Sequence, residues 1–241
     1  APAAVGGPDA RDSLPLPAPA RAFSNAVDLA APPRRVIWSP TMGFATIDRE
    51  VLAACEAAVA ALADAGTDVV ELDTVMSADP LEDWLTMWVV ARHKAQGLFM
   101  DTPEWEQISP SLRPQITAGA SVTGSDHARA LDACYRYRAE LADAMETADA
   151  DLVLCPTVAG QAPRLGEEGT IDGNAEVGWV QLTYGINLTR NPAGTVNAGY
   201  TAAGMPIGLQ VIGRHLDDAG VLAAMRTLET VVSDDRIAGV G

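Results

Sequence analysis

Hydrophobic residues recur along this chain in two patterns, short apolar runs and longer stretches with helical spacing. Residues 35–39 are β-branched and aromatic and predict a strand. Apolar residues then follow helical spacing from Val51 to Leu62, behind Asp48, which can cap a helix. Residues 69–72 predict a second strand. Strand, helix and strand in close succession form a βαβ unit, which places this part of the chain in the α/β class.

The alternation of helices and strands continues to the carboxyl end. Ser125 is predicted to cap a long helix that reaches Thr147, and Asp217 or Asp218 to cap the last helix. The other predicted elements are helices over 81–100 and 175–186, loops over 103–114 and 160–173, and strands over 151–155, 194–198 and 205–212.

The first 33 residues show no hydrophobic period and hold seven prolines. Proline removes a backbone donor and restricts the residue before it, so residues 1–33 predict an irregular Pro/Ala-rich arm, with room for a short helix near Phe23. Residues 34–241 are then expected to form a single α/β domain.

Charge and cysteine content narrow the classes of partner and compartment. The formal net charge is -16, which disfavours nucleic acid and anionic membrane surfaces as partners. No apolar run approaches the roughly 18 residues of a membrane span, and the amino end lacks a secretory pattern. Cys55, Cys134 and Cys155 are too few and too scattered for a disulfide framework, so we expect reduced thiols and a cytoplasmic location.

Residue chemistry by itself offers no complete catalytic set. The chain has no nucleotide-binding glycine motif, no HExxH pattern and no GxSxG elbow. Its three histidines lie on separate predicted elements, so we expect no metal site and no cofactor. Lys94, the only lysine, is expected to face solvent from mid-helix. Cys155, at a strand end, is a buried thiol on one interpretation and a nucleophile on another.

Several stretches, in order, resemble the amidase signature family. The strongest agreement is at the carboxyl end, with NLTRNPAGTVNAG at 187–199 and GMPIGLQVIGR at 204–214. DLVLCPT at 151–157, RVIWS at 35–39 and GPDARD at 7–12 resemble further family segments. The resemblance implies an α/β fold that is part of the amidase-type mixed β-sheet covered by helices, and hydrolysis of an amide bond as the activity.

The same resemblance indicates what this sequence lacks. Family members use a serine nucleophile, a bridging serine and a lysine base, in a Gly/Ser-rich region and a segment before it. No stretch here resembles that region, so the chain is expected to be the carboxy-terminal half of an amidase, processed or cut from something longer, and no catalytic residue is assigned. Family members act on small-molecule amides of many kinds, and fold kinship does not choose among them.

The resemblance suggests four residues near the substrate. Carried over by position, Thr157, Asn187, Thr189 and Asn191 become candidates for the pocket wall. Asn and Thr near proline are also good turn formers, so a purely local role stays open. Arg190 stands where the family usually has Gly, and Asn197 where it usually has Pro. A positive φ there would strain Arg190, unless Asn191 takes over that conformation.

Three functional readings remain open from the sequence. The first is a portion of an amide hydrolase that supplies fold and pocket walls. The second is a non-catalytic binding or interaction module derived from an amidase, and the third is a different α/β enzyme that uses Cys155 or a water. A half-sheet leaves an edge and an apolar face uncovered, so we expect pairing with an amino-terminal half or self-association.

Overall fold

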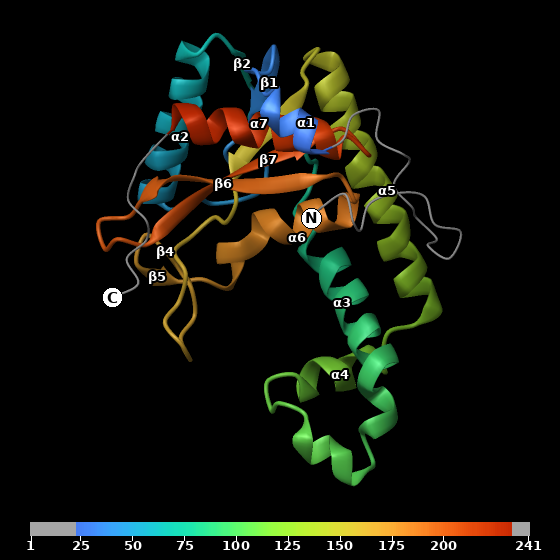
Figure 1. The fold of residues 1–241 in the computed structure, drawn as a ribbon. Coiled ribbons are helices and arrows are strands. Elements are labelled where there is room, and N and C mark those ends of the chain that lie inside the picture. Colours follow the sequence, from blue (N-terminus) through green and yellow to red (C-terminus); the bar gives the residue numbers. More distant parts are fainter. Residues whose placement is uncertain (1–22, 233–241) are drawn as a thin grey trace.

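A five-stranded mixed sheet forms the centre of the computed structural model, which describes residues 23–232 (Figure 1). The strand order is β2-β1-β3-β7-β6. β1 runs parallel to β2 and β3, while β7 is antiparallel to β3 and β6. The strands are β1 (Arg35–Trp38), β2 (Asp68–Glu71), β3 (Leu152–Pro156), β6 (Ala193–Tyr200) and β7 (Pro206–Gly213).

Helices cover both faces of this sheet, which confirms the predicted α/β class. A separate two-stranded hairpin pairs β4 (Thr170–Ile171), near the end of the predicted loop over 160–173, with β5 (Asn174–Ala175), which reaches the first residue of the helix predicted over 175–186. The helices are α1 (Phe23–Asp28), α2 (Arg49–Asp64), α3 (Leu81–Gln96), α4 (Arg113–Gly119), α5 (Gly124–Thr147), α6 (Gln181–Thr189) and α7 (Asp218–Val231). Short 3₁₀ segments are η2 (Gly97–Phe99), η3 (Pro103–Gln107) and η4 (Val177–Val180).

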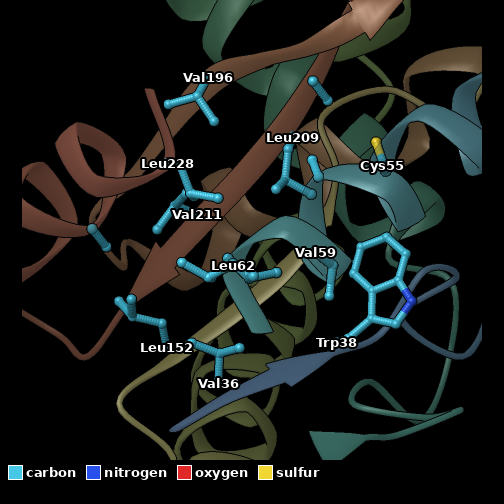
Figure 2. Close-up of a cluster of buried hydrophobic side chains, with 14 of the residues drawn as sticks. Val36, Trp38, Cys55, Val59, Leu62, Leu152, Val196, Leu209, Val211 and Leu228 are labelled. Atoms are coloured by element: carbon cyan, nitrogen blue, oxygen red, sulfur yellow. The ribbon is translucent and has the colours of Figure 1, made fainter. Parts of the chain in front are cut away.

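The first hydrophobic core lies between the sheet and helices α2 and α7 (Figure 2). Because side chains alternate along a strand, Val36 and Trp38 of β1 join this core while Ile37 points to the opposite face. Leu209 and Val211 of β7 occupy its centre and are completely buried. α1 packs against α7, so the short helix expected near Phe23 is confirmed; residues 1–22 of the predicted arm lie outside the described residues.

The second core lies on the other face of the sheet, under α5 and α6. Val153 and Cys155 of β3 meet Tyr137 and Leu141 of α5 there, and all four are almost fully buried. Figure 1 shows α6 and α7 on opposite sides of the strands β6 and β7. One face of the β6–β7 pair is therefore available to form a pocket with α6.

Two predicted helix starts were wrong, each for a local reason. α5 begins after Thr123 rather than at Ser125, because Thr123 and Asp126 form a reciprocal capping box whose Thr123 oxygen accepts from the Asp126 amide at 3.1 Å. The helix predicted over 175–186 begins six residues later, at Gln181, because the hairpin and η4 occupy the segment before it. The predicted loop over 103–114 holds η3 and the first residues of α4.

Candidate functional site

A cavity of about 410 Å³ opens between α6 and the β6–β7 pair. Four of its lining residues belong to α6 and the residue after it, at helical spacings of three and four, so they share one face of the helix. The opposite wall comes from β6, β7 and the turns that follow β3 and β7. The lining residues are Thr157, Thr183, Ile186, Asn187, Arg190, Asn191, Pro192, Ala193, Thr195, Gln210, Leu216 and Asp218.

The floor of this pocket depends on a glycine. Thr157 follows β3, and its amide donates to the Gly208 carbonyl at 2.8 Å. Its hydroxyl donates to the Thr195 hydroxyl at 3.1 Å, which ties the loop after β3 to β6. A methyl group on Gly208 would lie 2.7 Å from the Thr157 hydroxyl and 2.6 Å from a Thr195 methyl. Gly208 therefore leaves the space in which the two threonines meet.

The turn that follows α6 forms another part of the pocket wall. Arg190 adopts the left-handed conformation there, with φ 58° and ψ 24°. The alternative that Asn191 takes over this conformation was wrong, because Arg190 itself carries the positive φ that ends the helix. Asn191 instead donates from its side-chain amide to the Gly213 carbonyl at 2.8 Å, which joins this turn to the end of β7.

The four residues suggested by resemblance lie close together but face different ways. Thr157, Asn187 and Asn191 line the pocket. The Asn187 side-chain amide donates to the Thr183 carbonyl at 3.0 Å, and among the described residues no hydrogen bond engages its side-chain oxygen. Thr189 is buried behind them, donating to the Ile186 carbonyl at 2.8 Å and accepting from the Asn191 amide. Contact of any of the four with substrate stays a prediction.

Sequence reasoning missed the other polar lining residues, chiefly Thr183, Arg190, Thr195 and Gln210. The correct helix bounds would have found two of them, since Thr183 and Arg190 lie four before and three after Asn187. Thr195 and Gln210 are directly opposite each other in the β6–β7 register, which only the strand pairing reveals.

The structure disfavours Cys155 as a nucleophile. Its side chain is completely buried, and the Gln210 amide donates to its sulfur at 3.3 Å. Burial raises the pKa of the Cys155 thiol to about 12, and the Gln210 hydrogen bond offsets this only in part. The thiolate is the reactive form of cysteine, so this thiol lacks both the charge state and the access that attack on a carbonyl requires.

Neither the histidines nor the lysine suggests a second catalytic site or a metal site. His93 places Nδ1 3.1 Å from the Ile116 carbonyl, and His215 places its Nδ1 3.2 Å from the Arg190 carbonyl. Lys94 is exposed on α3, as predicted. Within residues 23–232, no group of three or more His, Cys, Asp or Glu side chains is arranged to hold a metal ion. The helices of that same range include none long and apolar enough to span a membrane.

Comparison with known proteins gives a consistent picture. The family model described as Amidase matches residues 3–222. An acylamidase of Rhodococcus erythropolis is 32% identical over 240 residues, covering 94% of this chain and 48% of the relative. A 2-amino-5-chloromuconic acid deaminase of Comamonas testosteroni is 28% identical, covering 91% of this chain and 46% of the relative. The chain thus spans about half the length of these two curated relatives.

Solved structures agree at the level of the fold. A 6-aminohexanoate cyclic dimer hydrolase superposes with a TM-score of 0.78 at 23% identity, covering 94% of this chain and 51% of that one. A bacterial aryl acylamidase of the amidase signature family superposes with a TM-score of 0.76 at 21% identity, covering 93% and 49%.

Proposed function

Because this chain belongs to the amidase family, we propose that it forms one part of an amide hydrolase and contributes walls of the substrate pocket. The observation that carries the proposal is the cavity of about 410 Å³ between α6 and the β6–β7 pair. Hydroxyls and side-chain amides dominate its polar lining, with Thr157, Asn187 and Asn191 among them. Such groups both donate and accept, as recognition of a neutral amide requires.

We further propose that the nucleophile lies outside these 241 residues, in a segment that supplies the serine, bridging serine and lysine of the family. Two observations support this division. Lys94 is exposed on α3, and among the described residues no hydrogen bond links its ammonium group to a hydroxyl. Ser39 is fully buried, and its hydroxyl has no hydrogen-bond partner among the described residues, so no base is placed to activate it.

The division of labour predicts a specific result with amide substrates. The purified chain is expected to leave a panel of aliphatic and aryl amides intact and to form no acyl adduct, while the same chain extended by the upstream coding sequence hydrolyses some of them. Mass spectrometry of the trapped intermediate would place the acyl group. An adduct on a side chain of this chain, Cys155 included, would contradict the proposal.

A matched pair of variants in the extended protein tests the pocket itself. Gly208→Ala is expected to raise KM severalfold, because its methyl group meets Thr157 and Thr195. Gly124→Ala is the control, since nothing lies within 4 Å of a methyl group at that position. Equal KM values for the two variants would count against substrate binding in this cavity.

We also propose that this chain associates with a partner. β2 is an edge strand, and a groove of about 580 Å³ between it and α5 is lined by apolar Val70, Leu72 and Val75. Unpaired edges and apolar grooves favour association, so we propose pairing with an amino-terminal half, or self-association in its absence. Size-exclusion chromatography of the chain alone is expected to show species larger than the 25.1 kDa monomer. A monomer that binds no apolar dye would argue for the stand-alone module instead.

The proposed location is the cytoplasm, and the proposed partners include neither nucleic acid nor membrane. The three cysteines are free thiols in the structure, which is consistent with a reducing compartment. The net charge of -16 would repel phosphate backbones and anionic lipid alike.

A further inference from the structure

One cation in the pocket wall has no anionic partner. Arg190 is exposed and lines the cavity between α6 and the β6–β7 pair. Within residues 23–232, no hydrogen bond or ion pair engages its guanidinium; the contact of Arg190 with the His215 ring is made by the backbone carbonyl. Several arginines form ion pairs, as Arg35 does with Asp68 at 2.5 Å, whereas Arg92 stacks on the Trp88 ring. Arg190 is the basic member of the lining residues of this pocket, in a chain with 32 acidic side chains against 16 basic ones.

Local backbone geometry does not explain an arginine at this position. Arg190 has a φ of 58°, in the left-handed region that glycine and asparagine occupy at lower cost. A positive charge does favour the carboxyl end of a helix such as α6. This helix-end stabilisation does not depend on which ligand occupies the pocket, so an experiment can separate it from a role of Arg190 in binding.

The remaining lining residues suit one particular class of ligand. Thr183, Asn187 and Gln210 are neutral hydrogen-bonding groups, and Asp218, in the first turn of α7, is the acidic member of the lining set. Neutral hydrogen-bonding groups can hold an amide group, while a guanidinium binds a carboxylate through two parallel hydrogen bonds. The cavity thus offers both kinds of recognition within about 410 Å³.

We infer that this pocket takes amides that carry a carboxylate, and that Arg190 binds the carboxylate. The inference rests on the proposed function of the pocket and narrows its substrate class. The positive charge of Arg190 selects the anionic ligand, and the neutral groups bind the amide end.

Calorimetric titration of the 241-residue chain with two ligands of equal length tests this inference. Succinamate has one amide and one carboxylate, and succinamide has an amide in both places. We expect succinamate to bind about tenfold more tightly at low salt. Arg190→Asn, which removes the charge yet tolerates a positive φ, is expected to abolish the difference, and Arg190→Lys to keep part of it.

The outcomes separate the inference from the function beneath it. Equal affinity for the two ligands, or a preference that survives in Arg190→Asn, overturns the role of Arg190 while leaving the amide pocket in place. Binding of neither ligand overturns the pocket assignment and the inference together. Thermal unfolding of both variants confirms that each is folded before its titration is compared.

Discussion

Replacing Leu209 with alanine is expected to lower the free energy of unfolding by about 3 kcal/mol. Leu209 lies on β7 in the interior of the sheet, completely buried in the first core between α2 and α7 (Figure 2). Truncation removes favourable burial and leaves a cavity that the surrounding core can fill only in part. Urea unfolding, followed by circular dichroism, measures the loss.

A matched leucine provides the control for this result. Leu165 lies in the loop before the hairpin and is fully exposed, so Leu165→Ala is expected to change stability by less than about 0.5 kcal/mol. A loss below about 1 kcal/mol for Leu209→Ala would contradict the packing of the first core, because buried leucines in tight cores cost 2 to 5 kcal/mol or so.

Replacing Asp48 with alanine is expected to cost about 2–3 kcal/mol of stability. Asp48 is 2% exposed, and its carboxylate holds two parts of the chain together. One oxygen accepts from the Glu50 amide at 2.9 Å at the start of α2, and the other from the Asp172 amide at 2.9 Å in the hairpin turn. Alanine would leave both amides without these acceptors in a poorly hydrated site.

Asn in place of Asp48 is the conservative comparison. Its single side-chain oxygen can serve only one of the two amides, so Asp48→Asn is expected to lose about half as much stability as Asp48→Ala. Hydrogen exchange of the Asp172 amide should rise more in the alanine variant. Equal stability of Asp48→Ala and the parent would show that this carboxylate does not join the helix to the hairpin.

Much of the fold was predictable because the sequence patterns that specify its helices and strands lie within a few neighbouring residues. The strand over 35–39 and the helix after Asp48 follow from side-chain pattern and capping chemistry that act within a few residues. The same holds for the last helix, which Asp217 caps as one of the two predicted candidates. The start of α6 was wrong because the two-residue strands β4 and β5 are stabilised by pairing, which short polar segments do not announce.

The candidate site was only partly predictable. Resemblance selected Thr157, Asn187 and Asn191, all of which line the pocket. The resemblance could not show that Thr189 points away from the pocket, because this depends on which face of α6 packs on the second core. The importance of Gly208 was also hidden, because its constraint comes from Thr157, fifty-one positions earlier in the chain.

By itself the sequence determined the α/β class, the order of the main elements and the likeness to amidases, because periodicity, capping and short motifs are properties of neighbouring residues. The tertiary structure decided the strand order, the burial of Cys155 and the meeting of Arg190 with Thr195 and Gln210 around one cavity. These depend on contacts between distant segments, which form only when hydrophobic burial brings the helices onto the sheet.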